Sequence, residues 1–467
     1  MWVSKSTPDS GGFTLKVNRN GSSETVEVTA DGEGFCSQAG ALLLSNLCDR
    51  LGLTEALSEA LAPTRQRRSA HDDGEILRNL IVTLAQGGEH VSDQAALRDQ
   101  PDLFGDVASD ATAFRAIERV GPVELEGIKA ARKVARERAF ALGAAPERSI
   151  LDVDAALLGA HSEKEGAAGN YKGGFGFHPM LCYLEGSDAA LDGVLRPGNA
   201  GSNTGADQVK AIEAGLEQLP PDAMQGEILV RGDSAACVHA VVDFCREGDI
   251  RFSVGHELSG PVREAITEVP DHAWVGAISQ GGVPVAEHPT RPREAYVTEL
   301  TDHLDLSAWP EGSRLICRRE RAHPGAQLSL IDTDGWRHQC FLTDQTEEDI
   351  AELDRAHRAH AHVEQRIEDA MALGLAKLPF RSFQMNEVWM QLVLAAQDIV
   401  GYTKALTLTG DLAKAKPQTL RYRLLHQAGR LARSGRRTRL RLARSWPWAT
   451  DLVAACKKLD ALPLPTG

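Results

Sequence analysis

Two aspartates stand two positions apart inside a short apolar run in the first third of the chain. In the segment SILDVDAALL, residues 149–158, Asp152 and Asp154 alternate with Leu151 and Val153. This period of two predicts a β-strand that carries both carboxylates on one face. Neighbouring carboxylates repel each other and lose hydration when buried, so a fold tolerates them beside a cation or a solvent-filled cleft. The pair is a candidate metal site, although an aspartate merely solvated at a strand end would give the same pattern.

The segments that follow predict an α/β fold, a mixed sheet flanked by helices. A glycine-rich turn leads into FGFHPMLCYL (175–184), which is typical of an antiparallel partner strand, and residues 190–195 form a third strand. An amphipathic helix and then a strand–helix–strand alternation come next. The apolar run Ile228–Val230 predicts a buried strand that ends at Asp233. Functional groups of open α/β sheets gather at such strand ends, so Asp233 is a second candidate.

The regions on either side of this core have different patterns. Residues 13–35 alternate around Asn20-Gly21, which predicts a small β-ribbon. From 38 to about 143 the apolar spacing of three and four predicts helices, including one that begins after Ser109. Residues 270–344 contain short strands and turns, which is too much structure for a simple connection and indicates an inserted β-subdomain.

Two helices are expected after this insert. The first begins at Thr346 and carries His360, Glu364 and Glu368 three or four positions apart, on one face. The second, at 386–412, is strongly apolar and is expected to pack against the sheet.

Charge is distributed unevenly along the 467 residues. The formal net charge is −14, yet between Lys414 and Arg444 there are eleven lysines and arginines and no acid. An acidic body with a basic C-terminal segment favours a locally bound polyanion. The segment is expected to be a basic helix that ends near Ser434-Gly435; a solvated helix that touches nothing is the alternative.

The composition also bears on the cellular compartment. No apolar run approaches the roughly 18 to 20 residues of a membrane span, and the N-terminus has no apolar core of a signal peptide. The eight cysteines are scattered and form no CxxC pair. This pattern is typical of buried thiols in a reducing cytoplasm.

The chain from about 40 to 445 resembles the RNase H-like DDE transposases of bacterial insertion sequences, in the branch with a β-strand insertion before the catalytic Glu. Four blocks carry the resemblance in the family's order. They are LDVDAALLGAHSEKEGAAGNYKGGFGFHPML, LRPGNAGSNTGAD, VRGDSA and HRAHAHVEQRIEDAMALGLAKLPF.

The resemblance implies phosphoryl transfer on DNA, namely strand cleavage and strand transfer of an insertion sequence. By position, Asp154 matches the first acid, with Asp152 as the runner-up, Asp233 the second and Glu364 the third. These carboxylates would hold two Mg²⁺ ions, for which Mn²⁺ can substitute, about 3.5–4 Å apart.

The implied partner is double-stranded DNA, as the inverted repeats of its own element and as target DNA, bound by a homodimer. The protein is expected in the cytoplasm, associated with the nucleoid when bound to DNA, and not in a membrane. The residues expected to contact DNA are Arg358, His360, Arg366, Arg421, Arg423, Arg430, Arg433, Arg436, Arg437 and Arg439.

The expected domains follow from these assignments. They are a β-ribbon at 1–36, a helical DNA-binding region at 37–145, the first part of the RNase H-like core at 146–269, the inserted β-subdomain at 270–345, the second part of the core with the catalytic Glu at 346–412, and a basic DNA-contacting segment at 413–467.

Three positions depart from the family pattern. Ala156, His360 and Met371 stand where the family usually has Thr, Arg and Lys. Histidine is only partly charged near neutral pH and methionine is uncharged, so the interaction with phosphate is weaker. An alternative function is therefore a catalytically impaired or domesticated DNA-binding protein derived from a transposase. A metal-dependent phosphodiesterase for small molecules is a third hypothesis, which the basic segment disfavours.

Overall fold

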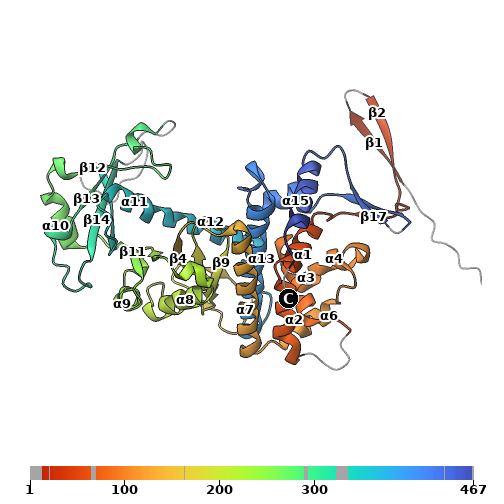
Figure 1. Cartoon of the computed structure of the whole chain (residues 1–467), viewed down its shortest axis with the longest axis horizontal. Coiled ribbons are helices and arrows are strands. Elements are labelled where there is room, and N and C mark those ends of the chain that lie inside the picture. Colours follow the sequence, from red (N-terminus) through yellow and green to blue (C-terminus); the bar gives the residue numbers. More distant parts are fainter. Residues whose placement is uncertain are drawn as a thin grey trace, which may run out of the picture.

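The computed structural model describes residues 13–19, 22–64, 70–161, 163–288, 293–321, 335–435 and 437–464. Asn20, Gly21, the three arginines at 65–68 and Arg436 lie outside these ranges. A sheet with its helices forms one half of the molecule and a helical bundle the other (Figure 1). Helix α13 (Phe383–Thr407) runs between the two halves.

The sheet has the mixed topology that the sequence predicts. Strand β4 (Ser149–Ala155) pairs antiparallel with β8 (Met180–Leu184), and β8 pairs antiparallel with β9 (Ala190–Val194). On its other side β4 pairs in parallel with β10 (Ile228–Gly232), which pairs in parallel with β11 (Arg251–His256). Because β4 and β10 run in the same direction, their carboxyl ends lie side by side.

The segment between 270 and 345 extends this same sheet. Strands β12 (Val275–Gly276), β13 (Ala295–Glu299), β14 (Arg314–Arg321) and β15 (Trp336–Thr343) are antiparallel neighbours. Strand β15 pairs antiparallel with β11, so the order across the nine strands is β12-β13-β14-β15-β11-β10-β4-β8-β9. The described part of this segment therefore shares a sheet with the core.

Helices cover both faces of the sheet, and strand alternation decides which side chains they meet. On one face, α8 (Gly205–Glu217), α9 (His239–Glu247) and α10 (Gly260–Glu268) share a hydrophobic core with Leu151 and Val153. On the other, α11 (Ile350–Arg358) packs on β13 to β15, and α12 (His362–Ala370) lies over β4. Asp152 and Asp154 share this second face, as their spacing predicts.

The helix expected from Thr346 begins later and is interrupted. Its first residue is Ile350, because the Asp349 carboxylate accepts the backbone N–H of Ala351 at 2.9 Å and caps the helix there. A 3₁₀ turn, Ala359–Ala361, separates α11 from α12. The prediction of a helix that starts at Thr346 was wrong by four residues. Asp349, which lies closer to the apolar residues of the helix, caps it instead.

The helical half forms from the segments in which the sequence predicts helices. It contains α1 (Ala41–Arg50), α2 (Leu53–Leu61), α3 (Asp73–Ala85), α4 (Ala95–Arg98), α5 (Pro101–Phe104), α6 (Asp110–Glu118) and α7 (Pro122–Ala139), with α15 (Ala449–Ala461) beside them. Ser109 caps α6, as expected, by accepting the N–H of Thr112. None of the helices in the described ranges has the length and apolarity needed to cross a membrane.

The basic segment after residue 428 is a β-hairpin and not the expected helix. Strand β16 (Gly429–Ser434) pairs antiparallel with β17 (Arg437–Leu442) and with the short β3 (Phe35–Cys36). Arginine alternates with threonine and leucine along β17, which is a period of two, and Gly435 adopts a positive φ of 59° at the turn. The helix prediction was wrong because it relied on the basic composition of the segment and overlooked this period of two. The N-terminal ribbon, β1 (Phe13–Arg19) with β2 (Ser22–Val28), is confirmed.

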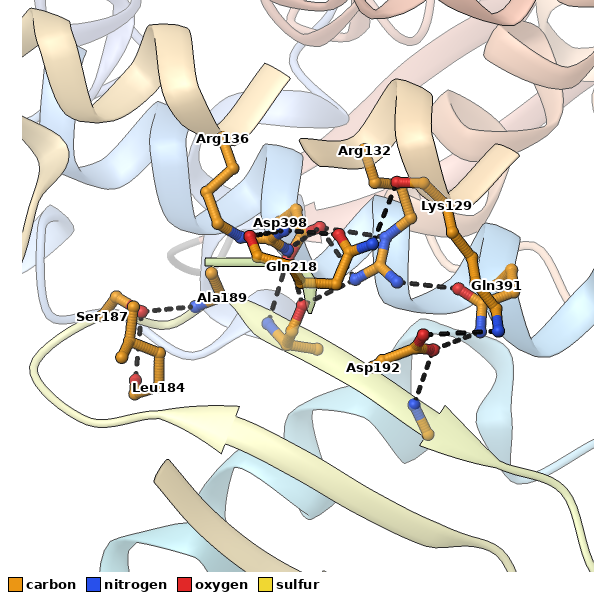
Figure 2. A network of polar contacts seen from close by, with 12 residues as sticks. Lys129, Arg132, Arg136, Leu184, Ser187, Ala189, Asp192, Gln218, Gln391 and Asp398 are labelled. Carbon is orange, nitrogen blue, oxygen red and sulfur yellow. Dashed lines mark hydrogen bonds and ion pairs between the residues drawn. The ribbon is translucent and has the colours of Figure 1, made fainter. Parts of the chain in front are cut away.

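A buried ionic network joins the two halves of the molecule (Figure 2). Arg132 and Arg136 of α7 both donate to Oδ2 of Asp398 on α13, at 2.9 and 3.1 Å. Both also donate to the carbonyl oxygen of Ala190 on edge strand β9, and Asp398 Oδ1 accepts the Ala190 N–H. The two guanidinium groups are 1% and 0% exposed, so Asp398 is the anion that makes their burial tolerable.

We expect the Asp398→Ala variant to lose about 3–5 kcal/mol of unfolding free energy, because two buried guanidinium groups would be left without their carboxylate. Denaturant unfolding followed by circular dichroism measures this loss. Asp460→Ala is the control, since Asp460 is 91% exposed and pairs with Arg50 at the surface, and should change stability by less than about 1 kcal/mol. Equal midpoints for the two variants would refute the role of the network.

Candidate functional site

Three elements bring the predicted acids toward one another. Asp154 lies near the carboxyl end of β4, and Asp233 directly follows β10, the parallel neighbour of β4. The Asp233 carboxylate accepts the N–H of Ala235 at 2.9 Å, which fixes the turn after the strand. Glu364 lies in the first turn of α12, which crosses over β4. The site is therefore assembled from two strand ends and one helix start.

The electrostatic environment of Asp154 includes the other two acids. Burial, assisted by repulsion from Asp233 and Glu364, raises the pKa of Asp154 to about 6. The N–H of Ala155 and the nearby His360 act in the opposite direction. The repulsion shows that the negative charges of Asp233 and Glu364 act on Asp154, in agreement with their placement at the ends of β4 and β10 and at the start of α12.

The donor chemistry of this group fits a hard divalent cation. All three side chains offer carboxylate oxygens, the ligands that Mg²⁺ prefers. Asp233 and Glu364 are exposed and Asp154 is half-buried, so their oxygens are accessible. In the ranges that the structure describes, no three His, Cys, Asp or Glu side chains already converge on one point as a metal site. Rotation of the exposed Asp233 and Glu364 side chains would be needed to bind an ion together with Asp154.

Asp152, the runner-up, lies beneath this group in a closed ionic network. Arg231 donates to both of its oxygens at 2.9 Å, His360 Nδ1 lies 3.0 Å from Oδ1, and Arg366 donates to Oδ2 at 3.3 Å. Burial by itself would raise the pKa of Asp152, but the hydrogen bonds from His360 and Arg231 outweigh it and hold the pKa below the usual value. Asp152 is 0% exposed, so its oxygens are committed within the protein.

Sequence reasoning did not identify Arg231, although it ties the site together. Besides Asp152, Arg231 contacts the Glu185 carboxylate at 2.6 Å after β8 and donates to the carbonyl oxygen of Ala356 in α11. It is completely buried. An arginine within an apolar strand, two residues before Asp233, was the available signal, because a buried arginine requires an acid on a neighbouring element.

The residues expected to contact DNA fall into different environments. His360 and Arg366 contact Asp152, and Arg366 is 7% exposed. Arg421 donates to the carbonyl oxygens of three residues on α3 and the turn after α12, and burial lowers its pKa to about 10. Arg423 lies over the Trp448 ring. These four side chains are thus engaged within the protein.

The hairpin arginines are arranged by the strand register. Arg430 is opposite Arg441, Ala432 is opposite Arg439, and Ser434 is opposite Arg437, which places four arginines on one face. All four are exposed, and none pairs with an acid among the described residues. Arg433 points to the other face and contacts Asp102. We call Arg430, Arg437, Arg439 and Arg441 the arginine face.

Comparisons with known proteins identify the family. No curated protein sequence matches the chain. Among solved structures, a cryo-EM structure of the piggyBac transposase synaptic complex with hairpin DNA is similar, with a TM-score of 0.42 and 10% sequence identity over 82% of this chain and 80% of that chain. Residues 18–464 match the family model of the transposase DDE domain, group 1. Because that match spans nearly the whole sequence, the chain belongs to the group 1 family of transposase DDE domains.

Proposed function

We propose that this transposase-family protein cleaves DNA at the ends of its own insertion sequence and transfers the freed strand to target DNA, with Asp154, Asp233 and Glu364 as metal ligands. The observation that supports the proposal is the placement of the elements: Asp154 lies near the carboxyl end of β4, Asp233 follows its parallel neighbour β10, and Glu364 lies at the start of α12, which contacts β4. The raised pKa of Asp154, to which repulsion from Asp233 and Glu364 contributes, agrees with this placement.

Two Mg²⁺ ions, or Mn²⁺ in their place, would activate the attacking oxygen and stabilise the leaving oxygen. The protein's own part is to hold the ligands. Water attacks the scissile phosphodiester, which leaves a 3′-hydroxyl on the element and a 5′-phosphate on the flanking strand. The 3′-hydroxyl then attacks a phosphodiester of the target, and the 3′-oxygen of the cut target strand leaves as a hydroxyl. Asp154 is preferred to Asp152 as the first ligand, because Asp152 already accepts four hydrogen bonds from Arg231, His360 and Arg366.

The proposed substrate is double-stranded DNA carrying the inverted repeats of the element, bound in the cytoplasm by a homodimer that joins two ends. The arginine face would bind the phosphate backbone. Like charges directly opposite each other in a hairpin are destabilising, and Arg430 faces Arg441 across the strands. A bound polyanion would remove this repulsion, whereas in a hairpin that contacts only solvent the repulsion would have no such compensation.

We expect Asp154→Asn, Asp233→Asn and Glu364→Gln each to abolish Mg²⁺-dependent cleavage of an element-end duplex while leaving folding and duplex binding intact, because each removes one anionic ligand. Cleavage is followed on denaturing gels, and binding by mobility shift. Glu368→Gln is the control, since Glu368 is one turn further along α12 and pairs with Lys416. A wild-type protein that binds the duplex but never nicks it, with Mg²⁺ or Mn²⁺, would instead support the catalytically impaired DNA-binding protein.

Asp152→Asn should behave differently from these three variants. Removing its charge leaves Arg366 buried without its anion and Arg231 with Glu185 as its remaining carboxylate, so we expect a loss of about 3–5 kcal/mol of unfolding free energy. Denaturant unfolding of Asp152→Asn beside Asp154→Asn measures the contrast. If Asp154→Asn lost as much stability as Asp152→Asn, the assignment of one acid to catalysis and the other to structure would be wrong.

Arg439→Ala should weaken duplex binding, because it removes one guanidinium group from the arginine face. The slope of log affinity against log salt should fall by about 0.9 for each phosphate that the variant no longer neutralises. Arg433→Ala is a matched control on the opposite face of the same hairpin, where Arg433 contacts Asp102. Salt titrations of both variants by fluorescence anisotropy test this. Identical slopes for the two variants would exclude the arginine face from DNA binding.

A further inference from the structure

A second arginine cluster lies away from both the acids and the hairpin. A cavity of about 250 Å³ opens between β14, β15 and the end of α11. Its lining includes Arg293, Arg318, Arg321, Arg337 and Arg358, together with Glu320. We call it the arginine pocket. Five guanidinium groups around one small cavity are costly unless anions accompany them.

The acids near the pocket balance only some of these charges. Arg318 is 3% exposed and pairs with Asp354 and Glu320, both at 2.8 Å. Glu320 is shared, because Arg293 also contacts it at 2.7 Å. Arg358, in contrast, makes no hydrogen bond or ion pair with the residues that the structure describes. Burial and then repulsion from Arg318 lower the pKa of Arg358, although Asp354 and Glu320 attract it. The lining of the pocket contains five guanidinium groups and one carboxylate, Glu320, which Arg293 and Arg318 share.

The strand directions place the pocket at the same edge of the sheet as the acids. Strand β15 is antiparallel to β11, and β14 is antiparallel to β15, so β14 runs parallel to β4 and β10. Arg318 and Arg321 lie in the carboxyl-terminal half of β14, as Asp154 does in β4. Four strand spacings of about 4.8 Å separate β14 from β4, which gives roughly 19 Å. A duplex covers that distance in about five or six base pairs at about 3.4 Å each.

We propose that the arginine pocket binds a backbone phosphate of the DNA duplex about five or six base pairs from the scissile phosphate, which rests on the proposed function of DNA cleavage. Guanidinium forks match phosphate oxygens, and their hydrogen bonds are charge-assisted. Arg358 supplies the free fork, and Arg318, held by Asp354 and Glu320, supplies a fixed charge behind it. The pocket thus sets the register of the duplex relative to Asp154, Asp233 and Glu364.

Arg358→Gln is the variant of choice, because Arg358 has no hydrogen-bonded carboxylate that the substitution would leave unpaired. Its control is Arg355→Gln on the same helix, where Arg355 pairs with Glu352 outside the pocket. Both are made in the full chain. Ethylation interference on an element-end duplex reads which phosphates matter. We expect Arg358→Gln to lose interference at a single phosphate position, to bind about ten- to a hundredfold more weakly, and to cleave at a less uniform position.

Retention of every interference position in Arg358→Gln, or the same loss in Arg355→Gln, would overturn the proposal. Calorimetric titration with inorganic phosphate tests the arginine pocket independently of DNA cleavage, because it requires no DNA. A failure of the pocket can therefore be distinguished from a failure of the proposed function. Saturable phosphate binding that is lost in Arg358→Gln supports an anion pocket even if the protein cleaves no duplex. If the protein binds phosphate but no interference position depends on Arg358, the anion that the pocket binds is not a phosphate of the DNA backbone, and the proposal is wrong. If wild type and Arg358→Gln bind phosphate equally, the arginine pocket is not an anion site.

Discussion

The arrangement of the candidate site depends on the ion pairs and hydrogen bonds of one buried carboxylate, that of Asp152. It draws Arg231 from β10 and His360 and Arg366 from the helical segment onto one point of β4. The three proposed ligands are close neighbours of these residues in sequence. Asp154 is two positions after Asp152, Asp233 two after Arg231, and Glu364 four after His360. The ion pairs of Asp152 therefore fix the backbone of the segments that carry Asp154, Asp233 and Glu364.

A second buried cluster does the same for the molecule as a whole. Asp398 gathers Arg132, Arg136 and the backbone of Ala190, and so fixes the helical half against the edge strand of the sheet (Figure 2). Ionic groups that are fully desolvated add little net stability, but removing one partner is costly, so they define one arrangement strongly. Both clusters work in this way. One positions the halves of the chain, and the other positions the proposed ligands.

The network also gives a physical context for a departure from the family pattern. His360 stands where an arginine is usual, and its Nδ1 lies 3.0 Å from Oδ1 of the buried Asp152. The phosphate contacts expected from this helix are therefore transferred, in our proposal, to arginines elsewhere. Arg358 lies at the arginine pocket, and four arginines share one face of the C-terminal hairpin. Both groups carry positive charge that the described residues do not fully balance.

The sequence by itself determined the order of strands and helices between residues 149 and 256, the shared face of Asp152 and Asp154, the strand end at Asp233 and the family, since these depend on local periodicity and on motifs. Only the tertiary structure decided which of the two aspartates is buried, where the basic segment turns into a hairpin, and that Arg231 holds the site. Those outcomes depend on partners far apart along the chain. Arg231 and Asp152 are 79 residues apart, and periodicity carries no information on such pairings.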